Sequence, residues 1–358
     1  MKITKPWFYD KFICIADRCT DNCCIGWEID IDPPAMERFE KASGEFGERL
    51  RSAIHTEGGC PAFALCEGER CALLREDGLC ELILNMGEDA LCDICALHPR
   101  FFGWYNGLKE AGLGLCCEEV CRLMFSDSAP LSFVSGEIDE LWEDTCSEEL
   151  LQLLLSARSE ILGMLQDRSC PLAERLYSAA IYTRRLQDIL DNGELRLPET
   201  VRISDAPSAE KGAAEALMSL YGEMESLNSE WDERYHALSE RLAEVTAALP
   251  RYLEACCDEL WRYEHIAVYF CYRHFLSGVF EGEVVSRMGL VFAAVYSIML
   301  MDCLVWLEKG AVTEWDRILN LKLYSKQVEY SEENTEMLLD AVWENALLSP
   351  ENIALSIK

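Results

Sequence analysis

Apolar residues recur every three or four positions through most of the chain after about residue 135. This period is typical of helices with one buried face. It predicts helices over residues 138–165, 171–190, 213–227, 230–262, 266–307 and 332–348, with Pro250 breaking or kinking the fourth. Because strand patterns are almost absent here, we expect residues 131–358 to form an all-helical domain. A polar, proline-containing stretch without periodicity, residues 196–212, is a candidate linker within it.

Residues 1–130 have a different pattern, with frequent glycines and turn signals. Within them, residues 25–32 alternate apolar with small or acidic side chains, which predicts a half-buried strand that Pro33 ends. We therefore expect a loop-rich module with short strands before the helices. The fold class predicted for the whole chain is mainly α.

Composition and charge narrow the range of partners. Half of the 358 residues are apolar, which supports a sizeable core and excludes wholesale disorder. With 32 basic and 64 acidic residues, the net charge is −32. This charge repels a phosphate backbone, so we expect no nucleic-acid partner. An acidic surface is also a common means of staying in solution.

The first residues contain no apolar stretch of signal-peptide length, so we expect a cytoplasmic protein with reduced thiols. Residues 288–307 are long and apolar enough for a membrane span. Asp302 interrupts this segment and no cluster of Lys or Arg flanks it, which favours a buried helix over a span.

Cysteine is the most unusual component, with 19 in the chain and thirteen of them between Cys14 and Cys121. Reduced cysteines at this density indicate metal ligation or catalysis. Sulfur ligands with almost no histidine favour an iron-sulfur cluster or thiolate zinc over a harder metal. Free cysteine is also a common small buried hydrophobe. We interpret the cysteines beyond residue 130 in this way, together with Cys60, Cys66, Cys116 and Cys121.

Four cysteine-containing segments occur in a characteristic order. They are FIC at residues 12–14 followed by Cys19 and CCIGWEIDID at residues 23–32, then CALLREDGLC at 71–80, CALHPR at 95–100 and LGLCCEE at 113–119. Together they resemble the flagellin lysine-N-methylase (FliB) family over roughly residues 8–125. This part is also similar to the zinc- or iron-chelating cysteine-cluster (YkgJ-type) family, a binding module without an activity. Members of the FliB family are expected to lack cysteine at positions 92, 116 and 121.

The resemblance implies S-adenosylmethionine-dependent N-methylation of lysine side chains on flagellin or a similar protein substrate. It also implies a cysteine module with a metal or an iron-sulfur cluster, expected as [4Fe-4S] with zinc as the alternative. The ligands carried over residue by residue are Cys14, Cys19, Cys23, Cys24, Cys71, Cys80, Cys95 and Cys117. These eight thiols exceed the four that one [4Fe-4S] cluster uses. The competing interpretation is a non-catalytic metal-binding module with a helical scaffold.

Methyl transfer requires a neutral amine, and since the pKa of free Lys is near ~10.4, the site must desolvate the amine or offer a base. The candidate catalytic residues are Asp30, Asp32, His98 and Arg100. Asp30 and Asp32 could equally form a solvated strand face, and His98 could be a packing residue.

A sulfonium is a cation that aromatic faces can hold. The candidate cofactor-binding residues are Trp27, Trp104 and Tyr105, for which core packing is the alternative. The chain has neither a strand followed by a Gly-rich turn and a helix nor the iron-sulfur motif with cysteine spacings of three and then two residues. In the helical part, Arg273 and His274 interrupt an aromatic segment, either as a satisfied core pair or as a wall of the site.

Overall fold

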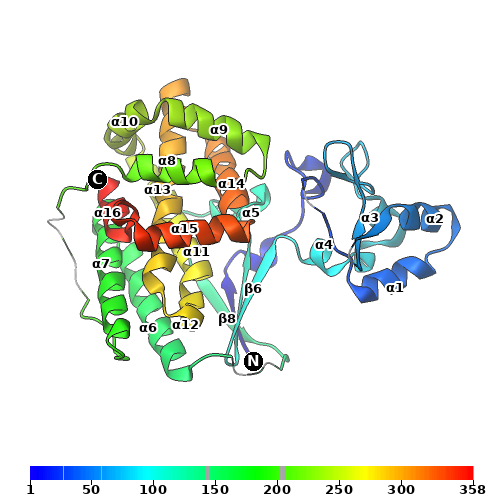
Figure 1. The fold of residues 1–358 in the computed structure, drawn as a ribbon, viewed down its shortest axis with the longest axis horizontal. Helices are drawn as coiled ribbons and strands as arrows, with labels where there is room; N and C mark the ends of the chain where they lie inside the picture. Colours follow the sequence, from blue (N-terminus) through cyan, green and yellow to red (C-terminus); the bar gives the residue numbers. More distant parts are fainter. Residues whose placement is uncertain are drawn as a thin grey trace. The chain divides into compact units, whose positions relative to one another are not determined.

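In the computed structural model the chain folds into two compact units (Figure 1). The helical unit comprises residues 1–10, 102–116 and 120–358, and the cysteine unit comprises residues 11–101 and 117–119. The boundary expected near residue 130 stays a prediction. The structure describes the whole chain apart from Trp27, Gly58, Trp142, Asp144, residues 201–202 and 204–206, and Lys358.

Helices make up most of the helical unit, which confirms the predicted fold class. They are α6 (Glu148–Leu165), α7 (Leu172–Asp191), α8 (Ala213–Glu223), α9 (Ser229–Glu240), α10 (Leu242–Ala255), α11 (Trp261–His274), α12 (Gly278–Glu281), α13 (Val284–Lys309), α14 (Glu314–Glu329), α15 (Glu332–Glu344) and α16 (Pro350–Ser356). A further helix, α5 (Glu118–Met124), begins in the cysteine unit and continues into the helical unit. After residue 137, the described residues form no strand.

The interior of the helical unit is organised around α13. It packs against α7, α10, α11, α14, α15 and α16. By length and composition α13 could cross a membrane, with a mean hydropathy of 2.1, yet 89% of its apolar window is buried within the structure. Asp302 lies in this buried window, 1% exposed. The prediction of a buried helix over residues 288–307 is confirmed.

Several predicted helix boundaries are wrong, for local reasons. The first helix begins ten residues later than expected, at Glu148, because Ser147 caps it by accepting a hydrogen bond from the Leu150 amide. The helix predicted over 230–262 is broken at Arg241, while Pro250 lies inside α10. The helix predicted over 266–307 is broken after His274, and Gly282 ends α12 with a φ of 80°, which favours glycine. Helices α14 and α16 were not predicted.

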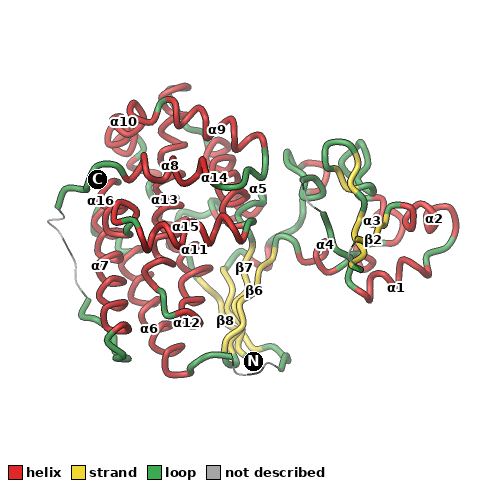
Figure 2. The backbone as a smooth tube through the Cα atoms, in the orientation of Figure 1, coloured by secondary structure: helices red, strands yellow, loops and turns green. Residues whose placement is uncertain are grey.

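The described residues of the helical unit also contain β1 (Lys2–Pro6), β7 (Leu108–Leu113), β8 (Phe133–Glu137) and most of β6 (Arg100–Tyr105), whose first two residues belong to the cysteine unit. They form one sheet in the order β6-β7-β1-β8, with β1 parallel to β7 and antiparallel to β8 (Figure 2). Ile3 lies opposite Lys109 on one side and Gly136 on the other. The described residues of the predicted linker 196–212 form no helix or strand, and five of its residues lie outside the described chain.

The cysteine unit has short elements joined by loops. They are α1 (Pro33–Lys41), α2 (Gly44–Ser52), β2 (Ile54–Glu57), β3 (Cys60–Phe63), β4 (Leu65–Cys66), β5 (Arg70–Cys71), α3 (Glu81–Met86) and α4 (Asp93–Leu97). Its core contains Phe39, Leu50, Phe63 and Leu73, all at most 2% exposed.

The strand predicted over residues 25–32 is wrong. Among its described residues only isolated bridges form, Ile25 with Arg70 and Asp30 with Ala62. The alternation is nevertheless real as a burial pattern, because Ile29 and Ile31 enter the core. The φ of Gly26 is 92°, outside the range of a regular strand, and the chain here makes single bridges instead of a ladder.

Candidate functional site

Five thiols gather at the core of the cysteine unit. Cys71 and Cys92 belong to the apolar core, and Cys24, Cys80 and Cys95 pack against it. Local structure brings them there: the Cys71 amide donates to the Cys24 carbonyl (2.8 Å), Cys80 precedes α3, and Cys92 and Cys95 stand at the start of α4. Residues distant in sequence therefore form one group, called here the thiol cluster.

The pKa values in the thiol cluster show that these groups interact. A hydrogen bond from Cys95 lowers the pKa of Cys92 to about 7, and the same bond together with burial raises the pKa of Cys95. A hydrogen bond with Cys23, burial, and the nearby Cys71 and Cys80 raise the pKa of Cys24. Cys24 and Cys95 thus resist ionisation, whereas Cys92 ionises more readily. A soft cation would offset the resistance, because metal binding displaces thiol protons.

The chemistry of the thiol cluster fits a thiophilic metal, since every donor is sulfur. Its arrangement does not enclose an ion: among the described residues, no group of three or more His, Cys, Asp or Glu side chains is placed to hold a metal. Metal ligation by the eight predicted cysteines therefore stays a prediction.

The other four predicted ligands are not members of the thiol cluster. They are Cys14, Cys19, Cys23 and Cys117. Burial raises the pKa of Cys19 to about 12, with further contributions from Glu118 and Cys117. The Thr20 hydroxyl donates to the Glu118 carboxylate (2.5 Å), which joins this loop to residues 117–119. Cys14 and Cys23 are exposed.

Cys92 is a cluster member that the predicted ligand set leaves out. Its side chain is fully buried, and it shares a hydrogen bond with Cys95. The Cys-x-x-Cys spacing of residues 92 and 95 was the available sequence signal. That spacing places two thiols on one turn at the beginning of a helix.

One of the predicted catalytic carboxylates, Asp32, accepts hydrogen bonds from the backbone at the start of two helices. It caps α1 by accepting from the Ala35 amide (2.8 Å), and it accepts from the Asp93 amide at the start of α4 (2.7 Å). Burial acts in the opposite direction, but these two bonds lower the pKa of Asp32. Asp30 is exposed and bridges to Ala62.

His98 and Arg100 lie just after α4. The His98 amide donates to the Ile94 carbonyl (3.1 Å), and the Arg100 guanidinium lies 5.5 Å from the centre of the Phe12 ring. Their catalytic roles, like those of the two aspartates, stay predictions.

The aromatic residues predicted to bind the cofactor belong to different environments. Trp104 lies beside Phe102, and both rings face the Lys109 ammonium, at 5.4 and 4.7 Å. Tyr105 is buried and stacks on Phe280 at 5.8 Å. Trp27 lies outside the described residues. Their role in cofactor binding is untested, and Tyr105 makes the contacts of a packing residue.

Arg273 and His274 share one carboxylate, that of Glu329. Glu329, 1% exposed, lies 3.1 Å from Arg273 Nε and 2.7 Å from His274 Nε2. The Ser325 hydroxyl donates to its second oxygen (2.5 Å). This matches the interpretation as a core pair.

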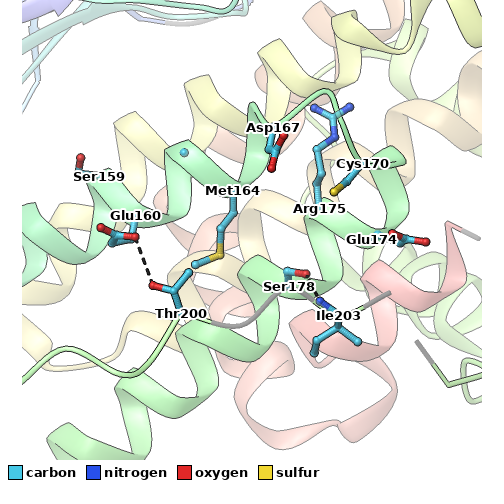
Figure 3. A pocket seen from close by; sticks show the side chains of 11 residues that line it. Ser159, Glu160, Met164, Asp167, Cys170, Glu174, Arg175, Ser178, Thr200 and Ile203 are labelled. Atoms are coloured by element: carbon cyan, nitrogen blue, oxygen red, sulfur yellow. Dashed lines mark hydrogen bonds between the residues drawn. The ribbon is translucent and has the colours of Figure 1, made fainter. Parts of the chain in front are cut away.

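A cavity of about 360 Å³ lies between α6 and α7 (Figure 3). Glu160 and Thr200 stand at one end, Asp167, Cys170 and Arg175 toward the other, and Met164 between them. No sequence pattern pointed to it, because it is formed by two helices and the loop that follows the second.

Comparison with known proteins identifies the family. The family described as FliB lysine N-methylase C-terminal domain matches residues 158–355, more than half of the chain. Flagellar biosynthetic protein FliU of Salmonella muenchen is 28% identical over 155 residues, covering 38% of this chain and 82% of that protein. Lysine-N-methylases of Salmonella typhimurium and Salmonella choleraesuis are each 28% identical over 145 residues, covering 35% of this chain and 33% of theirs.

The matched part thus spans about a third of the length of those lysine-N-methylases. No solved structure matches the chain. The domain match covers α7 to α15 and all but the last residue of α16, the same helices that enclose α13. The chain belongs to the FliB lysine N-methylase family.

Proposed function

We propose that this protein transfers methyl groups from S-adenosylmethionine to lysine side chains of flagellin or a similar protein, in the cytoplasm. The observation that carries the proposal is the family match over residues 158–355. The names of the relatives, lysine-N-methylase and flagellar biosynthetic protein, support the reaction and the flagellar substrate.

The cysteine unit is proposed as the metal-bearing part. Cys24, Cys71, Cys80 and Cys95 would hold an iron-sulfur cluster or zinc, with Cys92 as a fifth thiol beside them. A bound iron-sulfur cluster would supply an iron to which the methyl donor can coordinate, whereas zinc would stabilise the fold of the unit. Cys71 and Cys92 are buried in the apolar core, where a low dielectric strengthens charge interactions, whereas Cys24, Cys80 and Cys95 are partly exposed.

The activity is tested with the full chain, purified reduced and without oxygen. It is incubated with S-adenosylmethionine and monomeric flagellin, and lysine methylation is read by mass spectrometry alongside metal content per chain. The expected result is a gain of one or more methyl groups on lysine.

Two variants make the test specific. Cys24→Ser should remove both metal and activity, because one ligand of a four-thiolate site is lost. Cys256→Ser, in the helical unit between α10 and α11, should retain both. Full metal loading without methylation of any lysine would support the non-catalytic metal-binding module instead.

A further inference from the structure

Strand β8 forms one edge of the sheet in the helical unit. Among the described residues, its one strand partner is β1. At its start, the Phe133 ring stacks on Tyr272 of α11 at 4.2 Å, which anchors the strand to the helices. The other four residues, 134–137, are exposed. The strand is thus held at one end and open along the rest of its length.

The hydrogen bonds at the two ends of the β1–β8 ladder establish its pattern. Met1 donates to the Ile138 carbonyl (2.8 Å), and the Ile138 amide donates back to the Met1 carbonyl (2.9 Å). At the other end, the Trp7 amide donates to the Ser132 carbonyl (3.0 Å). Bonded and non-bonded pairs alternate along an antiparallel ladder. Every second residue of β8, counted from Ile138, therefore bonds to β1.

This alternation determines which backbone groups of β8 are directed outward. Val134 and Gly136 are bonded to β1, opposite Lys5 and Ile3. The amides and carbonyls of the alternate residues point away from β1, and they belong to Phe133, Ser135 and Glu137. No described residue forms a hydrogen bond with these outward groups. They are called here the open edge, and a row of such groups is a template for a further strand.

The chain that follows β8 runs toward the other side of the sheet. The Glu140 carboxylate lies 2.8 Å from the ammonium of Lys109 on β7. The Thr145 amide donates to Asn106, in the turn between β6 and β7 (2.9 Å). These contacts lead the chain past β7, so the described residues after β8 leave the open edge uncovered.

The sequence of β8 has none of the usual protections of an edge. Proteins block pairing at exposed edges with lysine, proline or β-bulges. Strand β8 reads FVSGE, and its register with β1 is unbroken over five residue pairs. An extended, unprotected edge is the feature to which a peptide adds as a strand, through main-chain hydrogen bonds.

Charge indicates what kind of peptide fits the open edge. Residues 123–157, which include β8, contain eight acidic residues and no Lys or Arg. Of the two lysines on β1, Lys5 is paired with Asp10 (2.7 Å), and Lys2 lies opposite Glu137 in the register. Both nearby cations are therefore offset by carboxylates. The field around the strand favours a basic occupant.

A second copy of this chain is the alternative occupant of an open edge. Each copy carries a net charge of −32, so the same acidic segments would meet side by side. A five-residue strand also offers little area compared with the roughly 1,200–2,000 Å² of a stable interface. Charge and area both favour an extended basic peptide over a second copy.

We propose that the open edge of β8 binds an extended, lysine-bearing segment of a partner protein as an added strand. The backbone of the segment pairs with the outward amides and carbonyls of Phe133, Ser135 and Glu137, and the acidic residues around β8 attract its lysines. Identifying the partner as the methylation substrate rests on the proposed function. Strand addition needs no methyl donor, so it can be measured by itself.

The test uses the full chain and a short blocked peptide that alternates lysine with threonine, a residue favoured in strands. Affinity is measured by calorimetry at low salt without S-adenosylmethionine, and amide hydrogen exchange is followed at single-residue resolution. The amides of Phe133, Ser135 and Glu137 should gain protection on binding. Those of Val134 and Gly136 should change little, because they are already bonded to β1. Binding without this alternating pattern would overturn the proposal.

Two further peptides separate strand pairing from charge attraction. In the first, two adjacent central residues carry N-methylated amides, which removes a donor from each edge of the peptide and keeps its charge. It should bind more than about tenfold more weakly. In the second, glutamate replaces lysine, and it should not bind. Equal affinity of the N-methylated peptide would mean that charge alone attracts the peptide, and equal affinity of the glutamate peptide would contradict a basic occupant.

The variant Ser135→Pro blocks the open edge from the protein side. The amide that it removes points away from β1, and proline is tolerated at such positions of edge strands. Peptide binding should weaken about threefold to tenfold, as for the loss of one backbone hydrogen bond. Ser128→Pro is the matched control, since Ser128 is an exposed loop residue before β8, and it should bind like the parent protein. Circular dichroism and thermal unfolding check that both variants fold.

A folded Ser135→Pro protein that binds as tightly as Ser128→Pro would refute the proposal. The comparison of peptides uses the parent protein, so it decides the proposal even if Ser135→Pro does not fold. Protection of the outward amides that rises with protein concentration, without peptide, would assign the edge to a second copy instead.

Methylation assays distinguish this inference from the proposed function. Flagellin methylation by folded Ser135→Pro at the parent rate would refute the open edge as the substrate site alone. Strand addition as expected, without methylation of any lysine, would refute the proposed function alone.

Discussion

Asp302 is an acidic residue in the middle of the most buried helix, and its carboxylate is fully engaged. It accepts hydrogen bonds from Tyr263 (2.6 Å), Asn320 (2.7 Å) and Arg317 (3.0 Å). Arg317 also donates to the Tyr252 hydroxyl (2.8 Å). Burial raises the pKa of Asp302, while Arg317 favours its charged form. Such a network holds three helices and the start of α11 in one arrangement.

We expect Asp302→Ala to lower the free energy of unfolding of the helical unit by about 3 kcal/mol, since it leaves a buried guanidinium without its buried carboxylate partner. Arg317→Met should have a similar cost. The double variant should lose clearly less than the sum, because the two charges are removed together. Urea unfolding followed by circular dichroism measures this, and strictly additive losses would contradict the coupling.

His274 gives the helical unit a pH dependence with a defined sign. Burial lowers the pKa of His274, although its hydrogen bond with Glu329 acts in the opposite direction. The unfolded chain then binds more protons than the folded chain just below the usual value of about 6.5. The contribution of neutral His274 to the free energy of unfolding should therefore be fully present above about pH 6.5. It should be lost as the pH drops through the folded-state pKa.

The variant His274→Gln keeps an amide that can donate to Glu329 and removes the titration. Urea midpoints at about pH 7.5 and 5.5 should differ less for this variant than for the parent protein. Burial also lowers the pKa of His265, which adds the same slope to both proteins. Equal slopes would mean that His274 has the same pKa in the folded and the unfolded chain.

At the scale of elements, α13 and α15 approach closely at a glycine. A Cβ on Gly289 would overlap the side chain of Val342. We expect Gly289→Ala to destabilise the helical unit by about 1–3 kcal/mol, because the well-packed interior must shift. Thermal unfolding measures the loss.

A substitution of Val342, the residue that faces Gly289, is the control for this contact. Val342→Ala opens the space that the new methyl group needs, so the double variant Gly289→Ala/Val342→Ala should be more stable than Gly289→Ala alone. If Val342→Ala only adds a further loss, the clash lies elsewhere.

The helices that the periodicity missed have a physical explanation. In α14, polar residues such as Asn320, Lys322 and Gln327 are buried together with the apolar ones. The helix therefore has no polar face, and a period of hydrophobic residues cannot reveal it. Helix α7 keeps such a face and was predicted to within a residue at each end.

At the scale of the molecule, the cysteine unit and the helical unit have separate cores. We expect metal removal by a chelator to expose residues 11–101 to protease while the helices of residues 148–356 stay protected, because metal binding is coupled to folding in a small loop-rich unit. Limited proteolysis with mass spectrometry reads both regions in one sample. Simultaneous loss of protection in both would contradict independent stability.

Cysteine density predicted the region of the thiol cluster, and the family resemblance included four of its five members but left out Cys92. A backbone hydrogen bond joins Cys24 and Cys71, which are 47 positions apart in the chain. Cys92 belongs to the cluster because its side chain is buried in the same core. Contacts of this kind depend on the conformation of the connecting loops, which a local sequence pattern does not predict. The α6–α7 cavity was missed for the same reason, since its walls come from separate elements.

The sheet joins strands that are far apart in the sequence, and this affects the order in which the chain folds during synthesis. Strand β1 pairs with β7, and the whole span of residues 11–101 is synthesised between them. On the ribosome, at about 5–20 residues per second, β1 waits several seconds for its partner. Residues 11–101 can begin to fold during that wait, before the sheet closes, whereas residues 117–119 of the same unit are made after β7. Contacts of such high sequence separation slow folding, and β1 should be the last part of the helical unit to gain protection from hydrogen exchange.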